Sequence, residues 1–390
     1  MRRLSLMLIL FLAVAGPGSV FAESKEPVKI GLSAAVSGGS AASGEAIKRG
    51  LQIAIDEING HGGVLGGRKL ELVVRDDEGN PQKGVTLARE LVEREKVAAV
   101  FGGLHTTVAL AQVPVWAELK VPYMGAWAAG TNITRNGQTP NYVFRVSAND
   151  DYVDRFLSRY ALDQLKKGKP GLLLENTPWG QSNEAGLTKW FGEKGVKTVG
   201  VERFNWNDPD MSPQLLRLKG AGADLIVLVA NAPEGAQVLR SKSKLGWDAA
   251  MISHWGISGG RFAELTGDLS DGVTFLQTYT FFGKQNERGQ YVLKMLREKY
   301  GVKEPGDVIA PVGTANAYDG LHLVAMAIDQ AGSTEGPKVR DALENLKGEY
   351  KGLIKTYKRP FTAEQHDALT DDDYVMVVWK GGKIVPISMK

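Results

Sequence analysis

Short apolar runs alternate with amphipathic segments of helical length along almost the whole chain, and this alternation restricts the fold more than any other feature. The run at residues 28–33 precedes a segment at 44–59 whose apolar residues recur at helical spacing. The same order continues through 70–75, 81–95, 97–101, 108–119 and 121–124. Strands that alternate with helices form parallel β-α-β units with right-handed crossovers, so we expect a parallel sheet with helices on both faces.

The pattern begins again in the second half of the chain. Strand-length and helix-length segments alternate at 171–174, 181–194, 197–203, 211–220, 224–229, 233–245 and 250–253, and further helices are predicted at 290–300, 313–331 and 337–346. Only residues 143–151 separate the two halves, without a low-complexity linker. A chain of 390 residues exceeds what one core usually supports, so we predict two α/β lobes. A short hinge crossed more than once would let the lobes close over a small molecule.

The first 22 residues predict export. Arg2 and Arg3 precede an apolar run at 4–14, and a small-residue boundary ends at Ala22. This is typical of a secretory signal peptide cleaved after Ala22, and the run is too short to span a membrane. Cleavage lowers the formal net charge from +3 to +1, which favours neither a nucleic acid nor an anionic membrane as partner. Because there is no cysteine, and so no lipid-modified anchor, we expect a soluble protein free in a bacterial periplasm.

The sequence lacks the usual motifs of catalysis and cofactor binding. The five histidines show no HxxxH or HExxH spacing, and without cysteine a zinc site would depend on histidines and carboxylates alone. The glycine-rich segment 37–44 is neither a P-loop nor a GxGxxG motif, and no GxSxG elbow occurs. We therefore predict no enzymatic activity, no metal and no cofactor.

Several short motifs, taken in order, resemble the periplasmic binding proteins for leucine, isoleucine and valine. These motifs are Lys29-Ile30-Gly31-Leu32-Ser33, Asp56-Glu57-Ile58-Asn59, Gly62-Gly63-Val64-Leu65-Gly66-Gly67-Arg68, Asp76-Asp77, Phe101-Gly102-Gly103, Thr106-Thr107, Val121-Pro122, Phe144-Arg145, Trp179-Gly180 and Ala317-Tyr318-Asp319-Gly320. No single motif is decisive, but their order and spacing together are specific to that family and cover almost the whole chain beyond residue 22.

The resemblance implies a type I periplasmic binding fold, with two doubly wound parallel-sheet lobes joined by three crossings. It places lobe 1 at residues 23–146 plus 279–357 and lobe 2 at 147–278 plus 358–390, after the signal peptide at 1–22. The implied function is the solute-binding component of an ABC importer, a monomer whose lobes close around a small organic molecule and present it to an inner-membrane permease. The alternative is a receptor that presents its closed form to a membrane sensor.

Candidate ligand residues in lobe 1 follow the predicted strands, where loops run into helix N-termini with free N–H groups. His105, Thr106 and Thr107 occupy such a loop, and the threonines suit a carboxylate or another hydrogen-bond acceptor. Their alternative role is to cap the helix that follows. In the resembling proteins the next loop presents backbone groups and a threonine hydroxyl to an amino acid head group. Ala128 and Ala129 lie in that loop here, and Ala129 stands at the place of the threonine.

Lobe 2 departs from the resembling proteins at one position. Family members that bind α-amino acids place an acidic residue just after the strand predicted here at 250–253, where it pairs with the ammonium. Trp255 stands at that place, and the nearest acidic residues in the sequence are Asp248 and Glu264. A buried ammonium without a countercharge costs several kcal/mol. Either the ligand lacks a free amine, or another group neutralises it.

Aromatic side chains dominate the predicted cleft instead. Trp127, Trp179 and Trp255 follow three different strands and suit an aromatic or extended apolar ligand, or a cation–π cage; the alternative is that they pack beneath the loops. Ser43 stands where the family often has an aromatic residue, which would enlarge the pocket, and Asn231 is placed to bind a polar group or to form a turn. We rank an aromatic or otherwise amine-poor carboxylate or amide above a hydrophobic amino acid as the ligand.

Overall fold

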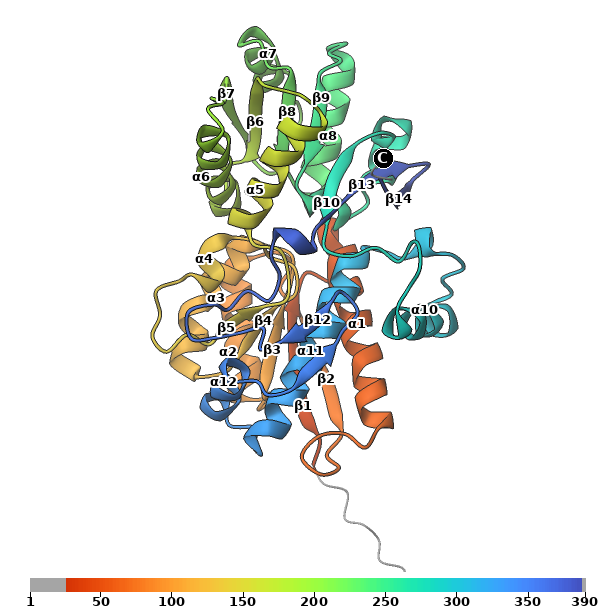
Figure 1. Ribbon diagram of the computed structural model, residues 1–390. Coiled ribbons are helices and arrows are strands. Elements are labelled where there is room, and N and C mark those ends of the chain that lie inside the picture. Colours follow the sequence, from red (N-terminus) through yellow and green to blue (C-terminus); the bar gives the residue numbers. More distant parts are fainter. Residues whose placement is uncertain (1–25, 388–390) are drawn as a thin grey trace, which may run out of the picture.

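The computed structural model describes residues 26–387 and contains two α/β bodies, one above the other in Figure 1. We call the lower body, with strands β1 to β5, lobe 1, and the upper body, with strands β6 to β10, lobe 2. The predicted signal peptide at 1–22 lies outside the described residues. Within 26–387, no helix has the length and apolar character needed to cross a membrane.

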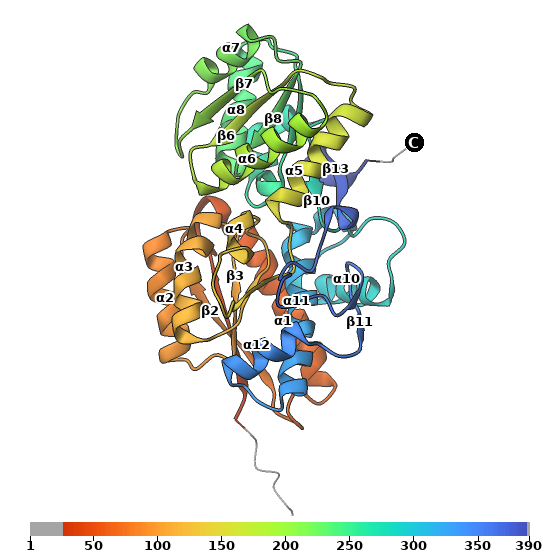
Figure 2. The ribbon, with the colours of Figure 1, turned by 60° about the vertical axis from the view of Figure 1, so that its left-hand side comes forward.

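The sheet of lobe 1 has the order β2-β1-β3-β4-β5, and all its strands are parallel. Its strands are β1 (Val28–Ala34), β2 (Leu70–Asp76), β3 (Ala99–Gly102), β4 (Tyr123–Gly125) and β5 (Val143–Arg145). Its first helices are α1 (Ala41–Gly60), α2 (Pro81–Glu93), α3 (Thr106–Leu119) and α4 (Thr131–Thr134). Helices α2 and α3 cover one face of the sheet, while α1 covers the other (Figure 2). Strand β1 is almost wholly buried, as expected for a strand covered on both faces.

The sheet of lobe 2 has the order β14-β13-β10-β9-β8-β6-β7. Its strands are β6 (Pro170–Glu175), β7 (Gly200–Phe204), β8 (Leu225–Val229), β9 (Ala250–Ser253), β10 (Thr274–Gln277), β13 (Val375–Lys380) and β14 (Lys383–Pro386). Strands β6 to β10 are parallel, whereas β13 runs antiparallel to β10 and to β14. Its helices are α5 (Asp150–Arg159), α6 (Pro178–Glu193), α7 (Ser212–Gly220), α8 (Ala232–Lys244), α9 (Phe262–Thr266) and the short 3₁₀ turn η3 (Trp255–Ser258).

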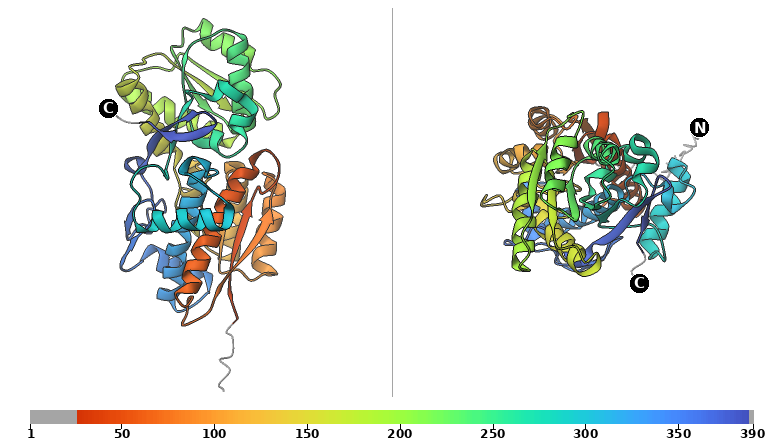
Figure 3. Two further views of the ribbon diagram at one scale, coloured as in Figure 1. Left: turned by 90° about the vertical axis from the view of Figure 1, so that its right-hand side faces the viewer. Right: turned by 90° about the horizontal axis from the view of Figure 1, so that it is seen from above.

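After β10 the chain returns to lobe 1. This part contains α10 (Glu287–Tyr300), α11 (Pro311–Ala331), α12 (Gly336–Glu344) and a hairpin of β11 (Glu349–Lys351) and β12 (Thr356–Lys358). Helix α11 packs closely on α1 at Gly50. A Cβ at this position would lie 2.2 Å from the carbonyl oxygen of Thr314, so the close approach depends on glycine. Helix α10 lies across α1 (Figure 3), and ion pairs join Arg288 to Glu57 and Lys299 to Asp56. Helix α11 also covers the sheet beside α1, since a Cβ at Gly320 would lie 3.1 Å from Phe101 Cε1 and 3.2 Å from Met124 Cγ.

The first and third of the three crossings between the lobes lie side by side. The amide N–H of Arg145, at the end of β5, donates to the carbonyl of His366 at 2.9 Å, and Ala368 N–H donates to the carbonyl of Arg145 at 2.9 Å. Arg145 Nε pairs with Asp367 Oδ1 at 2.7 Å, and both side chains are buried. Asn149 Nδ2 donates to Asp367 Oδ2 at 2.7 Å. One buried carboxylate therefore joins the two crossings.

The predicted fold class is confirmed, and the predicted helices and strands reappear with small shifts at their ends. Several elements have no predicted counterpart. They are the helices α4, α5 and α9, the parallel strands β5 and β10, the hairpin of β11 and β12, and the antiparallel strands β13 and β14 at the edge of the lobe 2 sheet. The antiparallel direction of β13 was not predicted, because a strand's direction depends on its partner. The partner of β13 is β10, about one hundred residues earlier in the chain. The lobe boundaries taken from the resemblance remain a proposal, since each crossing is a continuous segment.

We predict that Arg145→Met lowers the free energy of unfolding by about 3–5 kcal/mol, because it leaves the Asp367 carboxylate buried without its cation. Chemical denaturation measures this loss. The control is Arg89→Met, which removes an exposed ion pair with Glu118 and should lower the free energy of unfolding far less, because water and salt screen an exposed pair. Equal losses in the two variants would contradict the role assigned to Arg145.

Candidate functional site

In each sheet the chain changes direction once as it passes from strand to neighbouring strand. The candidate site lies at these two changes of direction. In lobe 1 the chain moves from β1 outward to β2 and then back to β3, and in lobe 2 from β6 to β7 and then back to β8. Ligands of open α/β sheets bind at the carboxyl ends of strands at such switch points. The segments that leave these ends carry Ser43 and His105 in lobe 1, and Trp179 and Asn231 in lobe 2.

In lobe 2 the structure brings Trp179, Asn231, His254 and Trp255 together. The ring centroids of Trp179 and His254 lie 5.0 Å apart, and those of His254 and Trp255 lie 5.9 Å apart. A Cβ at Gly256 would lie 2.6 Å from Trp179 Cη2 and 3.0 Å from Asn231 Oδ1, so the missing side chain lets these groups approach one another. Asn231 Oδ1 is buried and has no hydrogen-bond partner within residues 26–387.

The two lobes meet at a pair of tryptophans. The rings of Trp127, from lobe 1, and Trp255, from lobe 2, have centroids 5.7 Å apart, and both side chains are buried. The indole Nε1 of Trp127 has no hydrogen-bond partner in the described part of the chain. Beside this pair, Ser43 N–H donates to the carbonyl of Gly259 at 3.0 Å, while the Ser43 hydroxyl donates to the carbonyl of Ser40. The predicted residues Trp127, Trp255 and Ser43 therefore lie in the contact between the lobes.

Asp150, at the start of α5, joins the aromatic groups of lobe 2. Its Oδ1 accepts hydrogen bonds from Trp179 Nε1 at 3.2 Å and from His254 Nε2 at 3.0 Å. Its amide N–H donates to the carbonyl of Ala129 in lobe 1 at 2.8 Å. We define the interlobe site as Trp127, Asp150, Trp179, Asn231, His254 and Trp255.

Asp150 was not among the predicted site residues, because helix α5 was not predicted. Two signals were present: Asn149 followed by two acidic residues is typical of a helix start, and Val153, Phe156, Leu157 and Tyr160 recur at helical spacing. In the structure Asn149 is the N-cap, and its Oδ1 accepts from Asp151 N–H at 3.0 Å. These signals would have predicted the helix, although not the contacts of Asp150.

The two threonines of lobe 1 have different surroundings. His105 holds the N-cap position of α3, so neither threonine caps this helix. Thr106 Oγ1 accepts from Gly130 N–H at 3.2 Å and thereby supports the neighbouring loop. Thr107 Oγ1 is buried and has no hydrogen-bond partner within residues 26–387, so its hydroxyl remains a candidate for ligand binding.

Several backbone groups of Ala128 and Ala129 bond within the protein. Ala128 N–H donates to the carbonyl of Gly103 at 3.0 Å, and the carbonyl of Ala128 accepts from Arg145 Nη1 at 3.2 Å. The carbonyl of Ala129 accepts from Asp150 N–H. These groups hold the loop in place and are not free for a ligand in this arrangement.

A pocket of about 390 Å³ opens beside the site between the loop after β1 and the start of α8. His105, Trp206 and Asn231 are among its lining residues. Burial lowers the pKa of His105 to about 4, so this histidine is neutral at pH 7, and its Nε2 lies 3.2 Å from Ser40 Oγ. Glu175, at the end of β6, accepts from Trp206 Nε1 at 2.9 Å and from Asn231 N–H at 2.7 Å. Burial raises the pKa of Glu175 to about 7.

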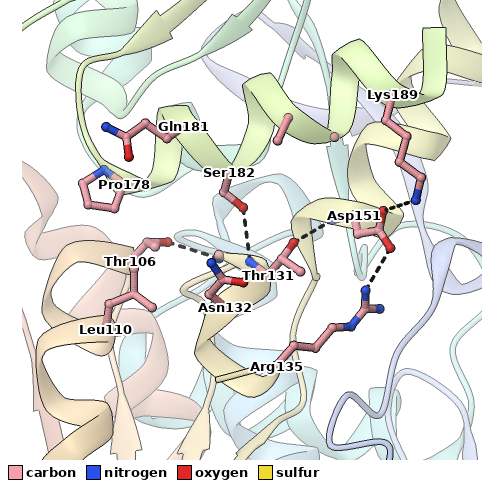
Figure 4. A pocket seen from close by; sticks show the side chains of 13 residues that line it. Thr106, Leu110, Thr131, Asn132, Arg135, Asp151, Pro178, Gln181, Ser182 and Lys189 are labelled. Atoms are coloured by element: carbon pink, nitrogen blue, oxygen red, sulfur yellow. Dashed lines mark hydrogen bonds and ion pairs between the residues drawn. The ribbon is translucent and has the colours of Figure 1, made fainter. Parts of the chain in front are cut away.

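A second pocket, of about 430 Å³, lies between α3 and α4 of lobe 1 and α6 of lobe 2 (Figure 4). Asp151 forms ion pairs with Arg135 from lobe 1 at 3.0 Å and with Lys189 from lobe 2 at 3.2 Å. Thr131 N–H donates to Ser182 Oγ across the lobes at 3.2 Å. Thr106 lines this pocket, but Trp127, Trp179 and Trp255 line neither of the two pockets.

The interlobe site combines buried aromatic surface with unpaired polar atoms. It offers indole surfaces, the unpaired donor of Trp127, and the unpaired acceptors of Asn231 and Asp150. Within residues 26–387 no three histidines or carboxylates lie close enough together to hold a metal ion. These groups can bind apolar surface and satisfy both donors and acceptors of a small molecule.

We predict that Glu175→Gln removes a pH dependence of stability. Because the folded protein raises this pKa from 4.5 to about 7, its contribution is fully present below about pH 4.5 and is lost as the pH rises to about 7. Wild type should therefore lose about 3 kcal/mol relative to Glu175→Gln between pH 4.5 and pH 8. Denaturant unfolding at several pH values measures this difference.

The control is Glu193→Gln at the exposed end of α6, which should follow the wild-type pH profile. If Glu175→Gln also followed that profile, Glu175 would not be the titrating group.

Comparison with known proteins agrees with this architecture. The family model described as periplasmic binding protein matches residues 27–383. The Leu/Ile/Val-binding protein homolog 2 of Brucella abortus is 28% identical over 95% of this chain and 94% of its own length.

Solved structures agree in fold. A type 1 periplasmic binding protein from Bordetella pertussis is similar with a TM-score of 0.84 at 24% identity, covering 93% of this chain and 100% of that one. An ABC transporter solute-binding protein from R. palustris, solved with 4-hydroxybenzoate, has a TM-score of 0.77 at 22% identity, covering 94% and 96%. Together with the family match, the two doubly wound lobes identify this chain as a member of the periplasmic binding protein family.

Proposed function

We propose that the protein is the solute-binding component of an ABC importer and that its lobes close over one small organic molecule at the interlobe site. The observation that carries this proposal is the meeting of Trp127 and Trp255 across the lobes, beside buried polar atoms without partners. Buried polar groups are normally hydrogen-bonded, so unpaired atoms between two lobes are explained by a solute that bonds to both. The role is binding without catalysis, in the periplasm, with an inner-membrane permease as partner.

The solute we propose has an apolar or aromatic body. Trp127, Trp179 and Trp255 supply large flat surfaces for such a body. Known relatives are consistent with both candidate ligand classes, since one is named for leucine, isoleucine and valine and another was solved with 4-hydroxybenzoate. An apolar body is thus common to both ligand classes, and the two classes differ in the polar head group attached to it.

Closure is the proposed mechanism. In this arrangement the lobes touch through Ser43 and Gly259, through Thr131 and Ser182, and through the ion pair of Arg135 with Asp151. A solute that bonds to both lobes favours the closed state, because its affinity for that state is higher. The closed surface then differs from the open one, which is what a permease requires to distinguish loaded from empty protein.

We expect a small apolar carboxylate or hydrophobic amino acid to raise the unfolding temperature of the mature protein, previously unfolded and refolded to remove bound solute. A true ligand at about 100 times its Kd adds about 2.7 kcal/mol of stability. A thermal-shift screen of L-amino acids and aromatic or aliphatic carboxylates measures this effect. No stabilisation by any compound of either class would contradict the proposed ligand chemistry.

We expect Gly259→Val to weaken binding of a solute found in that screen about tenfold or more, because the added Cβ would lie 2.2 Å from Leu104 Cδ1 across the lobes. The stability without solute should stay near that of wild type, since the open protein can avoid this clash. Isothermal titration measures the affinity. The control is Gly192→Val, where no other group lies within 4 Å, and unchanged affinity in both variants would argue against closure at this contact.

A further inference from the structure

A cavity of about 530 Å³ lies between the lobes, apart from the interlobe site. Lobe 1 contributes Ala42, at the start of α1, and residues 306–310, before α11. Lobe 2 contributes residues 258 and 260–264, together with residues of the hairpin that β13 and β14 form. We call it the hairpin cavity. None of the six residues of the interlobe site lines it, so a molecule held here would be distinct from the solute.

The walls of the hairpin cavity are largely apolar. The rings of Phe262 and Trp379 have centroids 5.7 Å apart, and both side chains are buried. Val308 and Ile384 add aliphatic surface, and Ile309 continues this surface to the outside, where its side chain is 41% exposed. Sites for small molecules are concave, mostly apolar and about 300–1,000 Å³ in volume. The hairpin cavity therefore has the size and the lining of such a site.

The charged side chains that line the hairpin cavity are paired with one another. Lys383 Nζ pairs with Asp307 Oδ1 at 3.1 Å across the lobes, and it also pairs with Glu304. Arg261 pairs with Glu264. A charged molecule would find no free countercharge here, and a charge buried without a partner is costly. The cavity is therefore suited to an uncharged molecule.

The wall from lobe 1 has an unfavourable backbone conformation. Ala310 has φ 44° and ψ 67°, a left-handed conformation that residues other than glycine rarely adopt. It also precedes Pro311, and a residue before proline favours an extended conformation. Such a conformation persists only where the surrounding structure imposes it, and it is typical of ligand sites. Here the ion pair of Asp307 with Lys383 ties the same loop to lobe 2, so this wall is preorganised.

The turn η3 connects the hairpin cavity with the interlobe site. It begins at Trp255, which belongs to the interlobe site, and ends at Ser258, which lines the cavity. Ser258 Oγ donates to the carbonyl of Trp255 at 2.7 Å. In lobe 1, Ala42 lines the cavity, and the next residue, Ser43, bonds to Gly259 across the lobes. The same closed contact therefore shapes both sites.

We propose that the hairpin cavity is a second binding site, for an uncharged aromatic or aliphatic molecule that acts as an effector of closure. Because its walls belong to different lobes, opening the lobes would pull them apart. A molecule that fills the cavity favours the closed state, as the solute does. By linkage, each of the two ligands then raises the affinity for the other. This coupling rests on the proposed function, whereas occupation of the cavity does not.

The competing explanation is that the cavity is a gap between the lobes that only water enters. The probe that separates the two explanations is 4-methylphenol, which has an aromatic body and is uncharged at neutral pH. Its comparison compound is 4-methylbenzoate, which has the same body with a carboxylate in place of the hydroxyl group.

The test variant is Ile309→Glu, which places a negative charge at the rim of the hairpin cavity. Leu216→Glu is the matched control, because Leu216 lies in α7 and does not line the cavity. The two wild-type side chains are 41% and 51% exposed, so both variants should fold.

Fluorine NMR of protein labelled with 5-fluorotryptophan reports occupation of the cavity through Trp379, whose line is the one that Trp379→Phe removes. We expect 4-methylphenol to shift this line in wild type. Its Kd should be about tenfold or more weaker in Ile309→Glu and unchanged in Leu216→Glu, because only the first variant changes the cavity. Any effect of 4-methylbenzoate should be the same in all three proteins.

Closure is measured separately with a pair of spin labels. The chain has no cysteine, so labels can be attached at Thr86→Cys in α2 and Thr188→Cys in α6, two exposed positions on different lobes. Double electron–electron resonance then gives the ratio of closed to open protein. We expect 4-methylphenol, without any solute, to raise this ratio about fivefold or more, and Ile309→Glu to abolish the effect.

A Trp379 line that did not move with 4-methylphenol, or that moved equally in wild type and Ile309→Glu, would overturn the second site. An effect of 4-methylbenzoate that depended equally on residue 309 would overturn the preference for an uncharged molecule. A shifted line with an unchanged ratio of closed to open protein would overturn the role in closure. None of these results bears on the proposed function, which the screen of amino acids and carboxylates tests by itself.

Discussion

The buried pair of Arg145 and Asp367 is the interaction on which the rest of the structure depends. It joins two crossings that lie more than two hundred residues apart in the chain, and Arg145 also donates to the carbonyls of Ala128 and Gly130 in the loop below the site. Asp367 in turn accepts from Asn149, the residue before Asp150. A charge pair taken out of water is favourable only when further hydrogen bonds satisfy it, and here they come from both the hinge and the site.

This arrangement ties the position of the site to the hinge. The helix that carries Asp150 begins where the first crossing ends, so a rotation of lobe 2 moves Asp150, Trp179 and His254 as one group. Trp127 belongs to lobe 1, and its carbonyl accepts a hydrogen bond from Ser147 Oγ in the first crossing. Opening the lobes would separate Trp127 from Trp255, whereas closing them brings the donor of one lobe toward the acceptors of the other. The hydrogen-bonding pattern of a solute can thereby favour the closed state.

Local patterns were sufficient for most of the fold and for part of the site. Alternating apolar runs predicted most of the longer helices and parallel strands, because helix and strand periodicity depends on neighbours within a few residues. The expectation that ligands bind at the carboxyl ends of parallel strands indicated four residues that the structure brings together: Trp127, Trp179, Asn231 and Trp255. It also pointed to Thr106 and to backbone groups of Ala128, which bond within the protein instead. Position at a strand end does not specify whether a group is free.

The sequence by itself determined an α/β chain of two lobes with an aromatic cleft, because periodicity and residue type act locally. Only the tertiary structure decided which polar side chain lies beside the aromatic residues of lobe 2. Asp150 meets Trp179 across 29 positions and His254 across 104, and neither spacing has a local signature. Side chains meet according to how elements pack and not according to their order along the chain, so the Asp150 carboxylate of α5 lies beside residues that follow β6 and β9.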